Sequence, residues 1–177
     1  MNAVVNLIHV LFDLLLTVVL FRLWLQLAGA DFYNPISQFV AKVTTPLTLP
    51  FRFLPDIKRF STSTFALAFV VGLSKIAVLQ TISGAGYPIL PMLLSSLFSV
   101  IDNMFSIVFW VVIARALLSW FNQGYNPVEA VLGQLTEPLL APVRRIIPPI
   151  GGLDLSVLFF IIGWQFLHQL IRGFFLM

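Results

Sequence analysis

The sequence predicts an all-α membrane protein of four transmembrane helices, arranged as two tandem parallel helix–loop–helix repeats. Of its 177 residues, 59% are hydrophobic and only 10% are charged, which leaves too little polar surface to clothe a water-soluble domain. Four apolar stretches also reach the roughly 20 residues that a helix needs to cross a bilayer. These stretches lie near 4–29, 62–83, 93–121 and 155–176.

The first stretch has a second interpretation as a cleaved signal peptide, because Ala28, Gly29 and Ala30 resemble a cleavage site. However, no basic residue precedes the apolar run, which is long and carries Asp13 and Arg22. We therefore favour a retained membrane helix.

The two halves of the chain, 1–88 and 89–177, match when the second is moved back by about 93 positions. We call these halves the first copy, with loop 30–61, and the second copy, with loop 122–154. Equivalent residues are Arg22 and Arg115, Asn34 and Asn126, Pro35 and Pro127, Thr44 and Thr136, Pro46 and Pro138, Pro50 and Pro142, Arg52 and Arg144, and Ser63 and Ser156. Because each copy crosses the membrane twice, both have the same orientation, and their pseudo-symmetry axis lies along the membrane normal.

Basic residues predict how the chain is oriented. The two long loops hold Lys42, Arg52, Lys58, Arg59, Arg144 and Arg145, whereas the opposite face has Arg172 alone. Since loops rich in Lys and Arg stay in the cytoplasm, we expect cytoplasmic loops and periplasmic termini in a bacterial inner membrane. The net charge of +3 suits anionic lipid better than nucleic acid.

Each loop is predicted to contain a short amphipathic helix. Apolar residues recur at helical spacing after Asn34-Pro35 and after Asn126-Pro127; they are Ile36, Phe39, Val40 and Val43, and Val128, Val131, Leu132 and Leu135. Asn suits the N-cap and Pro the first helical position, while Pro46 and Pro138 are expected to end the helices. We favour helices that lie in the membrane interface; a re-entrant segment is the alternative.

A basic stretch follows each helix, at Arg52 and at Arg144-Arg145. The plain interpretation is a topology signal, which we favour. The functional interpretation is a phosphate-binding site, because arginine binds phosphate bidentately. It predicts anionic lipid at Arg144 and Arg145, or an acidic segment of a partner protein.

Four titratable residues fall inside the predicted membrane helices and need partners, because a charge in the bilayer is costly. Asp13 and Lys75 lie at similar depths in the first copy, as do Asp102 and His168 in the second. We favour structural pairs that join the helices of each copy. The alternative is a polar path for protons or cations, with His168 as the group that titrates near neutral pH.

The composition argues against an enzyme. Without cysteine, the chain has no thiolate nucleophile and no cysteine-based metal site. Two histidines are too few for a metal site without nearby acids, and no nucleophile–base spacing is visible. We expect no catalytic residue, metal or cofactor.

Several strings in the second copy resemble the YggT family of bacterial and plastid membrane proteins, in its two-copy proteobacterial form. They are Arg115-Ala116-Leu117-Leu118-Ser119-Trp120-Phe121, Asn126-Pro127, Thr136-Glu137-Pro138, Arg144-Arg145-Ile146-Ile147-Pro148 and Gly152-Leu153-Asp154-Leu155-Ser156. The first copy departs from them, with Thr45 at the place of Glu137 and Phe53 at that of Arg145. Val157 also stands where the motif has proline.

The resemblance implies a multipass protein linked to osmotic tolerance and ion homeostasis in bacteria, and to cytochrome assembly and nucleoid distribution in plastids and cyanobacteria. It marks as functional positions Arg115, Asn126, Pro127, Thr136, Glu137, Pro138, Arg144, Arg145, Asp154 and Ser156. Glu137 and Asp154 lie on the same predicted side as three of the arginines, so we expect one polar cluster there.

Two function classes remain. The first is a non-enzymatic scaffold whose cytoplasmic loops dock membrane-protein partners or a second copy of the chain. The second is a transport or channel component that uses the intramembrane charges.

Overall fold

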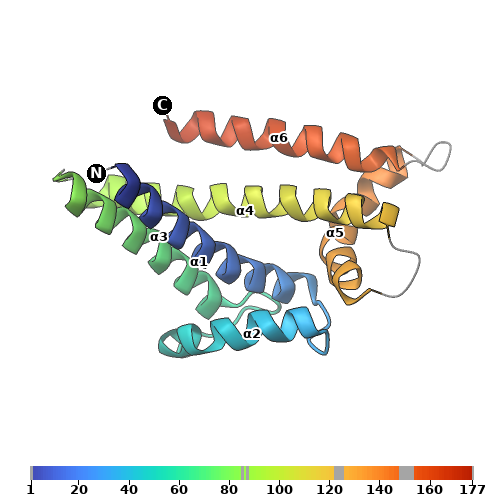
Figure 1. Ribbon diagram of the computed structural model, residues 1–177, viewed down its shortest axis with the longest axis horizontal. Helices are drawn as coiled ribbons and strands as arrows, with labels where there is room; N and C mark the ends of the chain where they lie inside the picture. Colours follow the sequence, from blue (N-terminus) through green and yellow to red (C-terminus); the bar gives the residue numbers. More distant parts are fainter. Residues whose placement is uncertain (1, 85, 87, 122–125, 148–153, 177) are drawn as a thin grey trace. The chain divides into compact units, whose positions relative to one another are not determined.

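The computed structural model describes residues 2–84, 86, 88–121, 126–147 and 154–176, and in this part every long element is a helix. The elements are α1 Asn2–Ala28, α2 Pro35–Thr48, the 3₁₀ turn η1 Leu49–Phe51, α3 Thr62–Ser83, α4 Ile89–Phe121, α5 Pro127–Ile146 and α6 Leu155–Leu176 (Figure 1). Four of them, α1, α3, α4 and α6, are long and apolar enough to cross a membrane. The predicted all-α class and the four membrane helices are thus confirmed.

Some predicted features lie outside the described residues. They are the motif residues Pro148, Gly152 and Leu153, and the side chain of Trp120.

The chain forms two compact units. The first contains Met1–Leu27 and Val40–Met104, and the second contains Ala28–Phe39 and Phe105–Met177. Helices α2 and α4 therefore contribute to both units. The units differ from the two sequence copies, whose boundaries stay a prediction.

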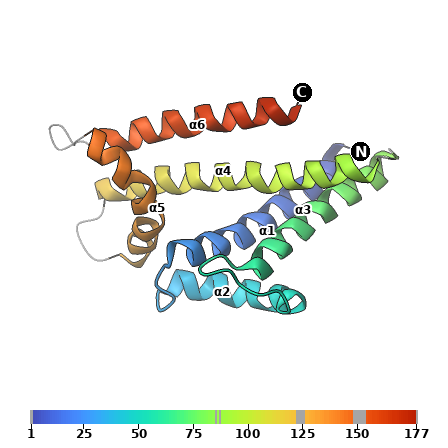
Figure 2. The same ribbon diagram turned by 180° about the vertical axis from the view of Figure 1, so that it is seen from behind.

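In the first unit, α1 and α3 run side by side in opposite directions (Figure 2). Leu16, Val19 and Leu20 are buried on α1 at helical spacing, and Ala68 is buried on α3. A Cβ atom at Gly72 would lie 3.2 Å from the carbonyl oxygen of Ser96, so this glycine lets α3 approach α4 closely. Helix α3 ends at Gly84, whose φ of 68° is left-handed, as is common for a helix C-cap.

In the second unit, the C-terminal part of α4 runs antiparallel to α6, and α5 packs against α6 (Figure 1). The indole Nε1 of Trp164 donates to the carbonyl oxygen of Phe105 at 2.9 Å. The rings of Trp164 and His168 lie 4.4 and 4.9 Å from that of Phe105. Aromatic packing therefore joins α4 to α6.

The predicted N-caps of α2 and α5 are confirmed. Asn34 Oδ1 accepts from the N–H of Ile36, and Asn126 Oδ1 from the N–H of Val128, both at 2.9 Å. These bonds satisfy backbone donors that the first helical turn leaves free.

The prediction that Pro46 and Pro138 end these helices was wrong. Helix α2 continues through Pro46 to Thr48, and α5 continues through Pro138 and Pro142 to Ile146. Proline removes one helical hydrogen bond, but side chains from α1 and α4 hold the turn before each proline. Arg22 binds Thr44 and Thr45, and Arg115 binds Thr136 and Glu137. The predicted basic stretch at Arg144 and Arg145 is consequently the last turn of α5.

Candidate functional site: the polar cluster of α4, α5 and α6

A chain of charged side chains ties α5 to the two membrane helices of the second unit. Arg115 on α4 donates from Nη1 to Thr136 Oγ1 at 2.5 Å and from Nη2 to Glu137 Oε2 at 2.8 Å. The same Glu137 carboxylate accepts from Arg144 Nη1 at 2.8 and 3.0 Å. One carboxylate on α5 therefore bridges two arginines.

Arg144 also reaches the start of α6. Its Nε and Nη2 both lie 2.8 Å from Asp154 Oδ2. The other oxygen of Asp154 accepts from the backbone N–H of Ser156 at 3.1 Å and from its hydroxyl group. Asp154 thus caps α6 and pairs with Arg144 at the same time.

We call Arg115, Thr136, Glu137, Arg144, Asp154 and Ser156 the charged cluster. The predicted association of Glu137 and Asp154 with arginines is confirmed. Among the other motif residues, Asn126 and Pro127 begin α5, Pro138 lies within it, and Arg145 is exposed in its last turn.

The arginines keep the acids of the charged cluster ionised. The pKa of Glu137 is lowered, chiefly by the hydrogen bond from Arg115, with Arg144 adding to the effect. Burial alone would raise the pKa of Asp154, but the hydrogen bonds from Ser156 and Arg144 outweigh it and lower the pKa. Burial alone would lower the pKa of Arg144, but Asp154 and Glu137 raise it. All three groups therefore carry their charges near neutral pH.

Two cavities adjoin the charged cluster. One, of about 510 Å³, lies between polar residues that include Arg144 and Asp154 and apolar residues that include Val112 and Leu140. The other, of about 560 Å³, is lined by Asn126, Gly133, Gln134 and Glu137 among others. Glu137 remains 48% exposed, so the charged cluster is accessible from outside the protein.

The first copy uses the equivalent arginine in a neutral setting. Arg22 Nη1 donates to Thr44 Oγ1 at 2.8 Å, to Thr45 Oγ1 at 3.0 Å and to the Ala41 carbonyl at 3.3 Å. Where Asp154 caps Ser156 in the second copy, the hydroxyls of Ser61 and Ser63 lie 3.0 Å apart. We call Arg22, Thr44, Thr45, Ser61 and Ser63 the neutral cluster.

Arg52 lies near enough to the neutral cluster for its charge to act on that of Arg22. It is exposed, and within the described part of the chain no acidic group lies within salt-bridge distance of it. Its sequence equivalent Arg144 is instead bound by two carboxylates.

The intramembrane pair predicted in the first copy is confirmed. Lys75 Nζ on α3 lies 2.6 Å from Asp13 Oδ1 on α1, with side chains 12% and 40% exposed. In the second copy His168 stacks on Phe105, and its pairing with Asp102 stays a prediction.

Sequence reasoning missed two contacts between the 28–39 segment and α5. Gln134 Oε1 accepts from the N–H of Asp31 at 2.9 Å, and the side-chain amide of Asn34 donates to the Pro127 carbonyl at 2.8 Å. The N-cap role of Asn34 was visible in the sequence, but a contact across about 93 residues was not.

Comparison with known proteins places this architecture in a family. The CCB3/YggT family model matches the chain twice, over residues 1–82 and 94–175. These segments correspond to the two predicted copies, while the parallel orientation of the copies stays a prediction.

Bacterial and plant proteins align with this chain. An uncharacterized protein in the proC 3′ region of Vibrio alginolyticus is 47% identical over 173 residues, which cover 96% of this chain and 94% of that protein. The uncharacterized protein YggT of Escherichia coli K12 is 37% identical over 158 residues, covering 88% and 82%. YlmG homolog protein 2, chloroplastic, of Arabidopsis thaliana is 37% identical over 54 residues, covering 30% and 22%. No solved structure matches the chain. The double match and the long alignments show that this chain belongs to the CCB3/YggT family.

Proposed function

We propose that this chain is a non-enzymatic membrane scaffold that docks a partner protein on the outer face of α5. The observation that carries the proposal is the charged cluster, which fixes the amphipathic helix α5 to two membrane helices while Glu137 stays half exposed. A surface that is already ordered loses little conformational entropy on binding. Helix α5 is therefore suited to present side chains to a partner.

The outer face of α5 carries groups that form hydrogen bonds. Exposed residues recur at helical spacing along it; they are Val128, Gln134, Glu137, Pro138, Pro142, Arg145 and Ile146. The cavity of about 560 Å³ opens near the N-terminal end of the same face. A partner segment that offers polar groups to Gln134, Glu137 and Arg145, and an apolar group to the exposed Ile146, fits this mixed surface.

The protonation of the acids supports a structural role rather than catalysis. Glu137 and Asp154 are bound by arginines and have lowered pKa values. A general base works best with a pKa near the working pH, so these carboxylates are weak bases.

Photo-crosslinking in native membranes tests docking. A photoreactive residue at Gln134 or Pro142 is expected to give a discrete adduct, whereas the same residue at Phe166, an exposed position on α6, is not. An adduct of twice the protein's mass would identify a second copy of the chain as the partner. No adduct at either α5 position, or an equal one at Phe166, would contradict the proposal.

We also propose that the two long loops are cytoplasmic and that both termini are periplasmic. The chain has no cysteine, so single cysteines report topology without background. A cysteine at Arg145 should react with an impermeant maleimide only after the inner membrane is opened. Reaction in intact spheroplasts would reverse the proposed orientation.

Transport is the alternative, and the geometry of Asp13 and Lys75 argues against it. A direct contact of 2.6 Å suits a pair that joins α1 to α3 better than a hydrated path. Proton and potassium flux into proteoliposomes separates the two classes. We expect no flux above that of the Asp13→Leu/Asp102→Leu variant; a clear excess would favour transport.

A further inference from the structure

A second exposed surface lies in the first unit, between α2 and α3. Residues 49–60 form a short loop that starts with η1 and closes with a tight turn. In that turn Ile57 and Phe60 exchange two backbone hydrogen bonds, of 3.0 and 2.9 Å. Lys58 has a left-handed φ of 54°, and it occupies the tip of the turn with Arg59. We call residues 49–60 the basic hairpin.

The basic hairpin is fixed to the start of a membrane helix. Asp56 Oδ1 accepts from the N–H of Thr62, the first residue of α3, at 3.0 Å. The hydroxyl of Thr62 donates to the Pro55 carbonyl at 2.6 Å. Because the candidate span begins at Thr62, Arg59 lies only three residues from it and hence close to the bilayer surface.

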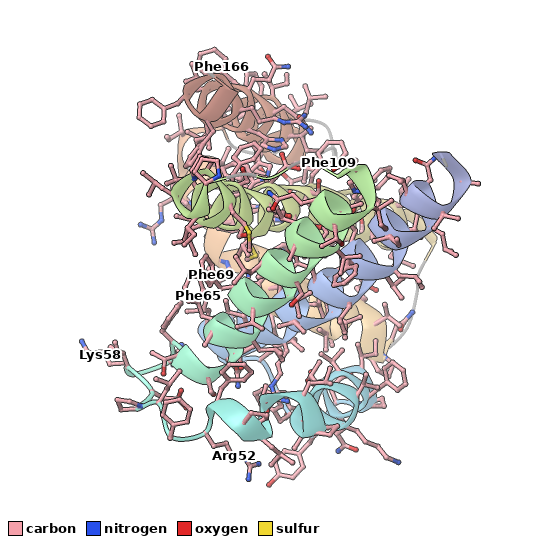
Figure 3. All side chains as sticks on the ribbon, turned by 90° about the vertical axis from the view of Figure 1, so that its left-hand side faces the viewer. Arg52, Lys58, Phe65, Phe69, Phe109 and Phe166 are labelled. Atoms are coloured by element: carbon pink, nitrogen blue, oxygen red, sulfur yellow. The ribbon has the colours of Figure 1, made fainter. Side chains whose placement is uncertain are left out.

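The cations of the basic hairpin are available to a ligand. Arg52, Lys58 and Arg59 are all exposed, and Figure 3 shows Arg52 and Lys58 directed away from the helices. Throughout the described residues, no acid lies within salt-bridge distance of these three. The hairpin's own acid, Asp56, is held by Thr62.

Apolar side chains of the basic hairpin are exposed as well. Phe53 is 78% exposed, Ile57 65% and Leu49 52%. On α2 itself, Val43 and Leu47 are exposed. Exposed aromatic and aliphatic groups among basic ones are typical of segments that lie in the membrane interface.

We propose that the basic hairpin inserts Phe53 and Ile57 into the interface and binds anionic phospholipid through Arg52, Lys58 and Arg59. The exposed apolar side chains and the link to α3 favour lipid over an acidic protein. An acidic protein segment would bind the cations but would leave the apolar side chains at the bilayer surface without contacts. The proposal concerns a surface other than α5 and stands without the docking function. It differs from the predicted site at Arg144 and Arg145, where Arg144 is bound by two carboxylates and Arg145 is exposed.

Depth-dependent quenching tests insertion. Because cysteine is absent, Phe53→Cys or Ile57→Cys carries a single bimane label in the full chain reconstituted into vesicles. We expect stronger quenching by shallow spin-labelled lipid when the vesicles contain phosphatidylglycerol than when they are pure phosphatidylcholine. Equal accessibility to aqueous iodide in both vesicles would overturn the proposal.

Charge variants test the lipid class. Arg52→Gln/Lys58→Gln/Arg59→Gln should weaken phosphatidylglycerol binding in detergent by about fivefold per residue removed. The matched control Arg145→Gln, an exposed arginine in the second copy, should change it far less. Competition by soluble glycerol phosphate as strong as by phosphatidylglycerol would show that free phosphate, not a lipid surface, is recognised, and would overturn the proposal. An acidic peptide that displaces the lipid and binds more tightly would do the same.

Discussion

The two copies use charge in opposite places. In the first copy an ion pair, Asp13 with Lys75, joins the membrane helices, while Arg22 at the helix end binds neutral hydroxyl groups. In the second copy His168, at the position equivalent to Lys75, stacks on Phe105, and the helix end carries the charged cluster. Residues at equivalent sequence positions therefore hold their helices together by different interactions.

Two substitutions account for most of the difference at the helix ends. Thr45 stands in place of Glu137, and Ser61 in place of Asp154. With both acids present, Arg144 is drawn into the cluster; without them, Arg52 stays exposed. The acids therefore decide whether this second arginine holds α5 or is available to the membrane.

The largest effect is expected inside the membrane of the first copy. Lys75→Leu leaves the Asp13 carboxylate without its cation, which should cost about 3 kcal/mol of unfolding free energy. Unfolding in mixed micelles of dodecylmaltoside and SDS measures this. The Asp13→Leu/Lys75→Leu double variant should recover most of the loss. A double variant as unstable as Lys75→Leu would show that the pair does more than join α1 to α3.

Replacing the equivalent arginines Arg115 and Arg22 should lower the free energy of unfolding by different amounts. Arg115→Met breaks one ion pair and the bond to Thr136, for a loss of about 2 kcal/mol. Arg22→Met should cost about 1 kcal/mol or less, because Thr44 and Thr45 keep their bonds to backbone carbonyls. In addition, the buried Nε of Arg22 has no hydrogen-bond partner among the described residues. If both variants lose the same unfolding free energy in the same micelles, the charged cluster is no more stabilising than the neutral cluster.

The periodic features could be predicted from the sequence. Apolar length identified the four membrane helices, asparagine and proline identified the starts of α2 and α5, and depth identified Asp13 with Lys75. The ends of α2 and α5 were predicted wrongly. Proline usually ends a helix, but side-chain contacts with α1 and α4 stabilise α2 and α5 next to Pro46 and Pro138. A count of basic residues alone also indicated the same roles for both loops, as a topology signal or a phosphate-binding site. Glu129, Glu137 and Asp154 outnumber Arg144 and Arg145 in the second loop, and only the geometry shows which arginine is neutralised.

Exchanging the residues at the equivalent positions Glu137 and Thr45 should give each cluster some of the properties of the other. Glu137→Thr removes the bridge between Arg115 and Arg144 and should cost about 1 kcal/mol, since the pairs are partly exposed. Thr45→Glu offers a carboxylate to Arg22 and Arg52, and should stabilise by several tenths of a kcal/mol. It should also lower quenching at Phe53→Cys by shallow spin-labelled lipid. Unchanged quenching would mean that Arg52 is not the residue that the acid controls.

The last effect concerns pH and belongs to the charged cluster. The pKa values of Glu137 and Asp154 are lowered in the folded protein, so the unfolded chain binds more protons at acidic pH. Their contribution is therefore complete above the ordinary carboxyl values of about 4, and is lost as the pH falls through the lowered values. Because both groups are partly exposed, we expect about 1 kcal/mol in total.

A matched variant isolates the contribution of these two carboxylates. Glu137→Thr/Asp154→Ser gives the second copy the residues of the first and should flatten the acid limb of the stability curve relative to the native sequence. Thr45→Glu should steepen it, because the new carboxylate would acquire a lowered pKa beside Arg22 and Arg52. If all three proteins lose stability in parallel below pH 4, the acid dependence comes from other carboxylates, and the two clusters differ in geometry but not in proton linkage.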